Sequence, residues 1–471
     1  MAKTMHAPSF PDTSQSSSAQ RVTAEQIEAG RVGKTLDKQH VFHTWSAQDK
    51  INPMVILDAE GSWVWDGEGN RLLDLTSQLM YTNAGHKHPK ILAAIKEQAD
   101  KLCTVAPQHS NETRSEAARL ITELLPADIN HVLFTNGGAD ANEHSVRMAR
   151  LHTGRRKVLS AYRSYHGGTQ LAVNITGNPK RRVPNDDQYG IVHFLPPYAY
   201  QSHFHSDSEE QEAERALAHL REIVVFEGPE QVAAILFEGI PGTAGIYKYP
   251  VSYMQGVREL CDEYGIVLII DEVMAGFGRS GKWFSHEHYG IEPDIVTFAK
   301  GVNSGYVPMG GVAMDDKIFD SFREETYPGG LTYSGHPLAA AAAIANIHAL
   351  RNEKMVENAA RVGQEVIGPR LEQIKNGHPA VGDVRGVGVF WAIELVKDKA
   401  TREPLAPYGQ VPPCVPRMVA AAKDRGVLPW SAMNRVQICP PLNVSDEEMH
   451  FGLDVLDEVL AIADEERESD A

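Results

Sequence analysis

Short apolar runs alternate with helix-like segments through the middle of the chain. Residues 267–270 (VLII) and 295–298 (IVTF) are too short and too β-branched for helices, and each precedes a charged residue. Both are predicted to be buried strands. Parallel strands need long crossover connections, so this alternation favours a mostly parallel sheet flanked by helices. The further segments that we predict as strands are 132–135, 157–161 and 233–237, and those that we predict as helices are 91–102, 141–151, 257–264 and 337–350.

The pattern also indicates how the chain divides. Residues 63–75 form two alternating runs around a Gly-rich turn, which is typical of a hairpin. We expect a large α/β domain over residues 86–344. A smaller α+β domain is expected from residues 21–85 and 345–471, with a strand at 387–395 and a closing helix. The Ser-rich residues 1–20 are expected to be a disordered tail.

Length and charge narrow the class of protein. A chain of 471 residues is long enough for more than one domain. The formal net charge of -17 argues against nonspecific binding to nucleic acid or anionic membranes. The four cysteines are scattered without a CxxC pair, and we find neither a signal peptide nor a long apolar span. These features favour a cytoplasmic location.

The two predicted strands place an acid and an amine at the same edge of one sheet. Asp271 follows the first strand and Lys300 follows the second, and this edge is where open α/β sheets bind ligands. Taken singly, Lys300 could extend from a strand end into solvent, and Asp271 could cap a helix. Taken together, a lysine that forms a Schiff base and a carboxylate that faces a pyridine nitrogen are the pair that pyridoxal phosphate (PLP) chemistry needs.

Two further segments fit a flat, phosphorylated ligand. A strand ends at Thr135, and a helix follows the glycine pair Gly137 and Gly138, so exposed N–H groups at that helix start could bind an anion. Tyr165 and His166 follow another strand, where an aromatic ring could stack on a heterocycle. Each segment alone has an ordinary structural explanation.

Other motifs are weaker. Residues 276–281 match G-x-G-x-x-G literally, but five residues separate them from their strand and no regular helix follows, which argues against a nicotinamide dehydrogenase. Three pairs of histidines lack helical i, i+4 spacing and a third ligand, so no metal site is predicted: His86 and His88, His203 and His205, His286 and His288.

Residues 269–312, IIDEVMAGFGRSGKWFSHEHYGIEPDIVTFAKGVNSGYVPMGGV, resemble the signature of the class III aminotransferases, which are fold-type-I PLP enzymes. The resemblance extends from about Trp63 to the end of the chain. It implies a mostly parallel seven-stranded sheet in a large PLP domain, together with a smaller domain from both termini. It also implies a homodimer, or a tetramer, with active sites at the subunit interface.

The resemblance carries over to individual cofactor residues. Lys300 would form the internal aldimine and act as general acid/base, while Asp271 would hold the pyridine nitrogen. The remaining cofactor contacts that the resemblance or the ligand edge suggests are Gly138 and Ala139 at the phosphate, Tyr165 and Val273 around the ring, His166, Glu238, and Thr332 from the neighbouring subunit. Ala139 stands where relatives usually have Ser, and Gly239 where they usually have Pro.

Substrate contacts are implied by shorter motifs. Arg435 matches an arginine that binds a substrate carboxylate or pairs with the glutamate at Glu238, because a guanidinium grips planar carboxylates through two hydrogen bonds. Three segments look like the branch that uses taurine or β-alanine donors, at residues 40–48, 77–89 and 103–120. Trp45, Met80 and Tyr81 would then line the pocket.

These observations predict a PLP-dependent aminotransferase that moves an amino group from an omega-amino acid or amine to pyruvate or 2-oxoglutarate by a ping-pong mechanism. A decarboxylating transaminase or an aminomutase on the same fold is the alternative. A noncatalytic PLP-binding regulator is less favoured, because the lysine is present and no DNA-binding helix-turn-helix is evident. The donor, the acceptor and the stereochemistry stay open.

Overall fold

A computed structural model describes residues 21–185 and 189–469 of the chain, so the tail expected at residues 1–20 lies outside the described residues. The chain forms two compact units. Among the described residues, one unit contains residues 21–59 together with Trp63–Leu72, and the other contains Glu60–Ser62 together with residues 73–185 and 189–469.

The first unit combines a capped helix with the predicted hairpin. Helix α1 (Ala24–His40) begins at a capping box, in which Thr23 Oγ1 accepts from the Gln26 amide while the Gln26 side chain accepts from the Thr23 amide. Strands β1 (Ile56–Glu60), β2 (Trp63–Asp66) and β3 (Arg71–Asp74) follow, and of these Glu60, Leu73 and Asp74 belong to the second unit. Asp66 closes the hairpin turn, because its carboxylate accepts from the amides of Glu68 and Asn70. The hairpin is confirmed.

The second unit is built on the mostly parallel sheet that the apolar runs predict. Its seven strands have the order β4-β10-β9-β8-β7-β5-β6, and only β10 runs antiparallel to its neighbours. The fold is therefore α/β of the expected class. The strands span Ile129–Thr135 (β4), Lys157–Ala161 (β5), Ile191–Phe194 (β6), Val232–Glu238 (β7), Val267–Asp271 (β8), Ile295–Phe298 (β9) and Gly310–Asp315 (β10).

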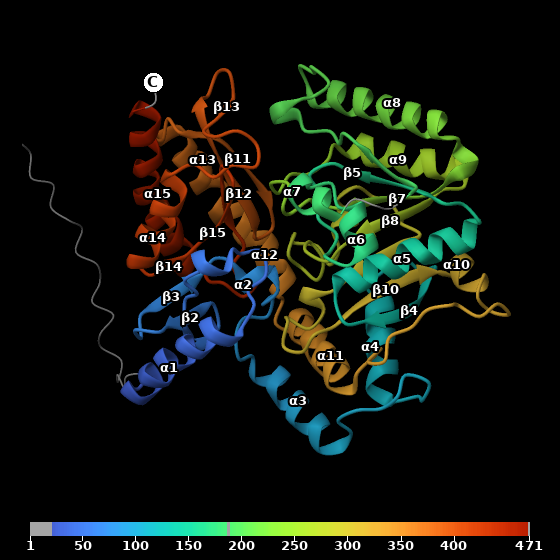
Figure 1. Ribbon diagram of the computed structural model, residues 1–471, viewed down its shortest axis with the longest axis horizontal. Coiled ribbons are helices and arrows are strands. Elements are labelled where there is room, and N and C mark those ends of the chain that lie inside the picture. The colour runs from blue at the N-terminus through green and yellow to red at the C-terminus, as the bar shows by residue number, and fades with distance from the viewer. Residues whose placement is uncertain (1–20, 186–188, 470–471) are drawn as a thin grey trace, which may run out of the picture. The chain divides into compact units, whose positions relative to one another are not determined.

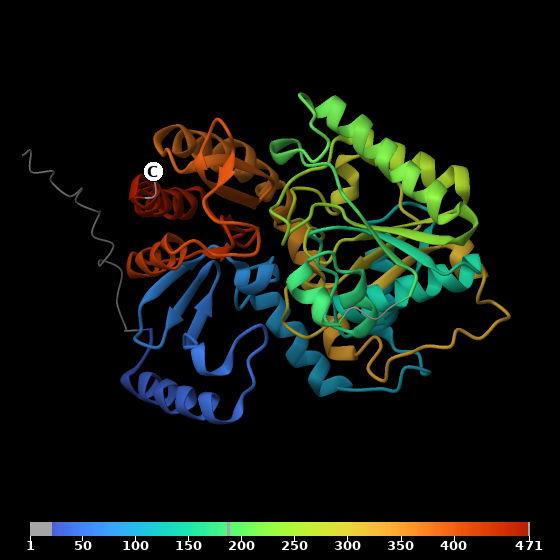
Figure 2. The same ribbon diagram turned by 45° about the horizontal axis from the view of Figure 1, so that its top comes forward.

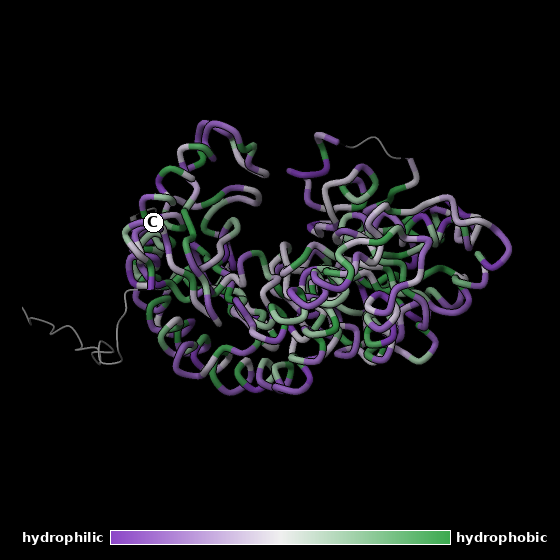
Figure 3. The backbone as a smooth tube through the Cα atoms, turned by 90° about the horizontal axis from the view of Figure 1, so that it is seen from below, coloured by the Kyte–Doolittle hydropathy of each residue, from purple (hydrophilic) through white to green (hydrophobic). Residues whose placement is uncertain are grey.

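Both faces of this sheet are covered by helices. Leu268 and Ile270 of β8 pack with residues of α8 (Glu209–Glu227) and α9 (Val251–Tyr264), whereas Ile269 packs with residues of α5 (Gly138–Thr153). Figure 1 shows α8 and α9 side by side. Coverage on both faces explains why β7, β8 and β9 are buried throughout and mostly apolar rather than alternating. In Figure 3, short hydrophobic and hydrophilic segments, green and purple, alternate along the tube.

Helix α11 (Pro337–Asn352) confirms the long Ala-rich helix and begins at its proline. Its small side chains are mostly buried, and it contacts α3 (Pro89–Lys101) and α4 (Glu112–Thr122). The shorter helices before the C-terminal part are α2 (Ser77–Met80), α6 (Gln170–Ile175), α7 (Pro179–Arg182) and α10 (Asp316–Asp320).

The C-terminal part of the chain, orange to red in Figure 2, forms an antiparallel sheet in the order β11-β12-β16-β15, with β13 paired to β12. The predicted strand near residues 387–395 is present as β12, although it begins later and ends later than expected. The elements are α12 (Met355–Val362), α13 (Gly368–Gly377), β11 (Val381–Val387), β12 (Phe390–Asp398), β13 (Glu403–Pro404), α14 (Cys414–Asp424), β14 (Val427–Leu428), β15 (Trp430–Ala432), β16 (Arg435–Ile438) and the closing α15 (Asp446–Ser469).

No helix within residues 21–185 and 189–469 is long and apolar enough to cross a membrane.

Candidate active site

Asp271, the last residue of β8, is the centre of a buried hydrogen-bond cluster. Its side chain is almost fully buried, and its Oδ2 accepts from Asn142 Nδ2 at 2.8 Å and lies 2.8 Å from His166 Nδ1. Its Oδ1 accepts from the Val273 amide at 2.9 Å. Because a carboxylate only accepts hydrogen bonds, the His166 Nδ1 facing it is the donor. The sheet thus fixes one carboxylate in one orientation at its carboxyl edge.

The partners of Asp271 are themselves held. Thr297 Oγ1 of β9 donates to Asn142 Oδ1 at 2.8 Å, and Asn142 Nδ2 also reaches the His166 carbonyl at 2.8 Å. The His166 amide donates to Thr176 Oγ1 at 3.0 Å. Asn142, Thr297 and Thr176 were not predicted from the sequence. A threonine inside the apolar run 295–298 and an asparagine near the start of α5 were the available signals.

Lys300 follows β9 and has a left-handed backbone, with φ of 46°. Burial lowers the pKa of its ammonium, while the charges of Asp271 and Glu238 oppose that shift. The environment therefore favours the neutral amine more than water does. The structure brings Lys300 and Asp271 to the same sheet edge, as the two strand ends predict.

The glycine turn after β4 meets the segments around Asp271. Thr135 Oγ1 donates to the Gly137 carbonyl at 2.9 Å, and α5 begins at Gly138. A Cβ on Gly138 would lie 2.8 Å from the Val273 side chain. A Cβ on Gly167 would lie 2.6 Å from Ala139 Cβ. The predicted phosphate turn and the predicted ring contacts are therefore adjacent, and they are close only because these glycines lack side chains.

Glu238, at the end of β7, is buried and held by main-chain amides. Its Oε1 accepts from the Tyr165 amide at 2.8 Å and its Oε2 from the Gly242 amide at 2.9 Å. Burial raises the pKa of this carboxyl. The Arg181 guanidinium lies 4.3 Å from the centre of the Tyr165 ring, a cation–π contact that the sequence did not indicate. Glu238 therefore fixes the Tyr165 backbone.

Arg435 is buried at the start of β16, close to the loop that follows β7. Its Nη2 donates to the Thr243 carbonyl at 2.9 Å, and its Nε has no hydrogen-bond partner among the described residues. Burial lowers the pKa of this guanidinium, an effect that the charge of Glu394 opposes. Glu394 itself forms an ion pair with Arg385 at 2.5 Å. Of the two predicted roles, pairing with Glu238 is not what the structure shows, since Glu238 binds amides instead.

The remaining predicted residues lie elsewhere. Met80 is buried in a cluster with Ile240 and Ala275, which follow Glu238 and Asp271 in the chain. Tyr81 packs closely on Gly305. Trp45 belongs to the other unit and is 63% exposed. Thr332 is exposed in the segment before α11, and its role in a neighbouring subunit stays a prediction.

Glu272, the second acid of the pair, points away from the Asp271 cluster. Its Oε1 accepts from Ser285 Oγ at 2.7 Å and from the His286 amide at 3.0 Å, while its Oε2 is buried and has no partner among the described residues. Burial raises the pKa of Glu272 to about 7. A Cβ on Gly239 would lie 2.0 Å from the same Ser285 Oγ. The unusual glycine after Glu238 thus makes room for this serine.

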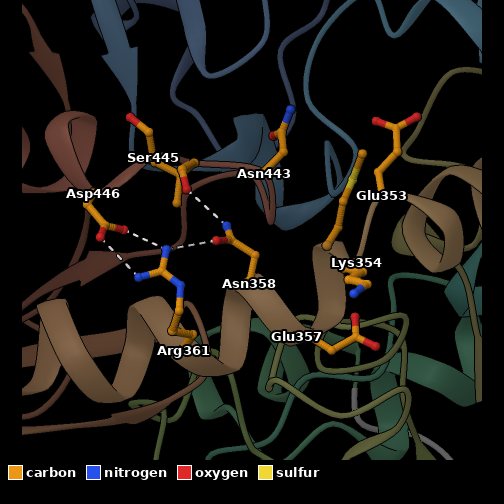
Figure 4. Close-up of a pocket in the computed structure, with 10 residues that line it drawn as sticks. Glu353, Lys354, Glu357, Asn358, Arg361, Asn443, Ser445 and Asp446 are labelled. Carbon is orange, nitrogen blue, oxygen red and sulfur yellow. Dashed lines mark hydrogen bonds and ion pairs between the residues drawn. The ribbon is translucent and has the colours of Figure 1, made fainter.

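A separate surface pocket lies between α12 and the start of α15 (Figure 4). Arg361 and Asp446 form an ion pair there, with distances of 2.6 and 3.0 Å, and Arg361 also donates to Asn358 Oδ1 at 3.0 Å. No group of His, Cys, Asp and Glu able to hold a metal ion occurs in the described parts of the chain. The pocket contains none of the predicted site residues.

A comparison with protein families decides the class. The sequence model described as Aminotransferase class-III matches residues 45–460. The chain belongs to the class III aminotransferases. PLP is therefore its cofactor, and it transfers amino groups from omega-amino acids or amines to a 2-oxo acid.

Individual class III relatives cover nearly the whole chain. The crystal structure of taurine:2-oxoglutarate aminotransferase from Bifidobacterium kashiwanohense, in complex with PLP and glutamate, is 40% identical with a TM-score of 0.89, and covers 93% of this chain and 98% of that one. Taurine–pyruvate aminotransferase of Bilophila wadsworthia is 32% identical over 89% of this chain and 95% of its own length. Putrescine–pyruvate aminotransferase of Pseudomonas aeruginosa is 35% identical over 79% and 84%, respectively.

Proposed function

We propose that this aminotransferase takes its amino group from an omega-amino acid that carries a second, acidic end, with taurine and β-alanine as candidates, and gives it to pyruvate or 2-oxoglutarate in a ping-pong cycle. The observation that carries the proposal is the buried Arg435. Within the described residues it forms no ion pair, and its Nε lacks a partner. A buried guanidinium without a carboxylate is costly unless a ligand supplies the anion.

The likeness to two taurine aminotransferases supports a donor with an acidic end, because both alignments cover most of this chain. They differ in the acceptor that their names give, so both acceptors stay within the proposal. The loop after β7 adds support. Gly242 binds Glu238 and Thr243 binds Arg435, so one short segment connects the two side chains.

The residues at the sheet edge fit PLP. Gly138 and Ala139 would offer amides to the phosphate at the start of α5, and the close approach of Gly138 to Val273 would bring that turn beside the ring contacts. Asp271 would accept from the pyridine nitrogen, and His166 and Asn142 would keep its carboxylate aimed. When bound, PLP supplies an electron sink for the bond that loses its proton.

Lys300 would hold the cofactor at its Nζ and, when released by the amine donor, would move the proton at the donor carbon. Its lowered pKa suits both roles, because a neutral amine is the nucleophile and the base. Tyr165 and Val273 would lie against the two faces of the ring. We also propose a homodimer in which Thr332 of one subunit reaches the phosphate of the other, since Thr332 is exposed here.

A donor panel tests the function. Taurine, β-alanine, 4-aminobutyrate and putrescine are each assayed with pyruvate and with 2-oxoglutarate. The purified protein is expected to be yellow, and the visible absorbance that gives this colour is expected to fall when a productive donor is added. Carbon dioxide release, or an isomerised product without consumption of the 2-oxo acid, would instead establish the decarboxylating or aminomutase alternative.

The role of Arg435 is tested with Arg435→Gln. We expect kcat/KM for taurine and β-alanine to fall about a hundredfold, because a charge-assisted pair is lost, while putrescine is nearly unaffected. Arg370→Gln is the matched control, since Arg370 pairs with Asp454 and Asp457 on α15. An equal loss for acidic and basic donors would refute the assigned role.

A further inference from the structure

The helix-like segment α2 has an unusual backbone. Ser77, Gln78 and Met80 have φ values of 44°, 60° and 57°, a left-handed conformation that residues other than glycine rarely adopt. Three such residues within four positions are unfavourable in isolation, and this conformation persists only when surrounding contacts impose it. The contacts that impose it are therefore informative.

Asp74 is the first anchor of this segment. Its side chain is fully buried and accepts from Thr76 Oγ1 at 2.7 Å, from the Gln78 amide at 3.1 Å and from Gln78 Nε2 at 2.9 Å. It also lies 3.0 Å from His86 Nε2. One carboxylate thus binds both backbone and side chain of the turn.

Arg279 is the second anchor. It is the largest fully buried side chain, and it has no carboxylate within ion-pair distance among the described residues. Its Nη2 donates to Asn83 Oδ1 at 2.8 Å and to Ser77 Oγ at 3.1 Å, and its Nη1 donates to the Pro440 carbonyl. A buried guanidinium that binds only neutral acceptors is expensive for stability, which points to a role beyond packing.

The anchored segment contributes to the site from both ends. Met80 packs in the cluster with Ile240 and Ala275, close in sequence to Glu238 and Asp271. The Asn83 side chain packs directly against Gly301, the residue after Lys300. A Cβ at position 301 would lie 2.5 Å from Asn83 Nδ2. A shift of Arg279 would displace both contacts.

We propose that Arg279, together with Asp74, is a positioning residue that holds residues 76–83 in their strained conformation and thereby sets which amine donors the site accepts. The proposal deepens the proposed function and rests on it for the donor-dependent part. Arg279 acts through Met80, Tyr81 and Asn83 rather than on the substrate.

The test compares Arg279→Lys with Arg258→Lys. A lysine keeps the charge but cannot make the forked bonds to Ser77, Asn83 and Pro440. Arg258 is a mostly buried arginine on α9 that pairs with Asp294 and Asp262, and it belongs to none of the site contacts. For Arg279→Lys, we expect the ratio of kcat/KM between β-alanine and putrescine to change about tenfold, and amide hydrogen exchange in a peptide covering residues 73–84 to accelerate.

Ser77→Ala is the second variant, because it removes only one acceptor of Arg279 and leaves the charge in place. We expect Ser77→Ala to change the donor ratio of kcat/KM and to accelerate amide exchange at residues 73–84, both by less than Arg279→Lys does. Unchanged exchange at residues 73–84 in both variants overturns the proposal, whatever the activities are. A donor ratio that Arg258→Lys changes equally also overturns it. If the wild-type protein transfers no amine from any donor, the proposed function fails, while the exchange comparison still decides whether Arg279 anchors the segment.

Discussion

The Asp271 cluster and the Arg361 pocket hold charged groups in opposite ways. Asp271 is buried and receives hydrogen bonds from a main-chain amide, an asparagine and a histidine, and the last two are held by further partners. Arg361 and Asp446 instead neutralise each other at the surface, with side chains that are 40% and 47% exposed (Figure 4).

The hydrogen bonds around Asp271 preorganise its carboxylate for a ligand, whereas Arg361 and Asp446 only neutralise each other. Fixed donors around a buried carboxylate cost no reorganisation when a ligand charge develops nearby, and low dielectric strengthens their effect. An exposed ion pair is screened by water and salt, and its two long side chains lose entropy on pairing. Proximity of opposite charges alone is therefore a poor guide to a site.

The largest expected effect is at Lys300. Lys300→Ala removes both the nucleophile and the base, so we expect turnover with any donor to fall about a thousandfold or more. Steady-state rates measure this, and circular dichroism checks that the fold is retained. Activity close to that of the wild type would exclude the assigned role.

Asp271→Asn tests the cluster directly. The amide keeps the shape of the side chain but loses the charge and places N–H groups against donors, so kcat should fall about a hundredfold or more. Asp446→Asn makes the same chemical change in the surface pocket and should leave kcat unaltered. Similar losses in both variants would remove the distinction between the two regions.

Glu272→Gln tests how a mainly burial-driven pKa shift affects stability. The folded protein keeps the Glu272 proton up to a pKa of about 7, whereas the unfolded chain loses it near 4.5. Between these values the folded state binds more protons, so the free energy of unfolding falls as pH rises. Gln removes that loss, and the variant should be more stable than the wild type by about 3 kcal/mol above pH 7 and little different below pH 4.5.

Thermal unfolding at pH 5 and pH 8, at one protein concentration and with saturating PLP, measures this difference. A stability gain that is the same at both pH values would mean that packing, not the proton, is responsible.

The smallest effect is expected at Arg361. Arg361→Ala breaks the exposed pair with Asp446 and should lower the free energy of unfolding by less than about 1 kcal/mol, with kcat unchanged. Urea unfolding at low and high salt measures it, and the wild type should approach the variant as salt screens the pair. A larger loss that salt does not reduce would show that this pocket is more than a surface contact.

The sequence predicted what depends on local pattern. The apolar runs located β5, β7, β8 and β9 closely, because a strand covered on both faces is apolar throughout. Since parallel strands place their ends at one edge, Asp271 and Lys300 followed from the same reasoning. Strand β10 was not predicted, because it begins with Gly310 and Gly311, and glycine is depleted in strands.

What could not be predicted depends on contacts between distant segments. Asn142, His166 and Thr297 meet at Asp271 from three different elements, and no spacing in the chain encodes that meeting. The left-handed backbone of Ser77 was likewise not predicted, because the hydroxyl of this residue contacts a buried arginine, Arg279, about two hundred positions later.

The space shared by Gly239 and Ser285 has a consequence for comparing related chains. A proline at 239 would bring its Cβ to 2.0 Å from the Ser285 hydroxyl, and that hydroxyl is the one that donates to Glu272. The residues at positions 239 and 285 are therefore expected to covary among related chains. A homologue with proline at the first should carry a smaller or differently turned residue at the second, and a pairwise swap should succeed where either single exchange fails.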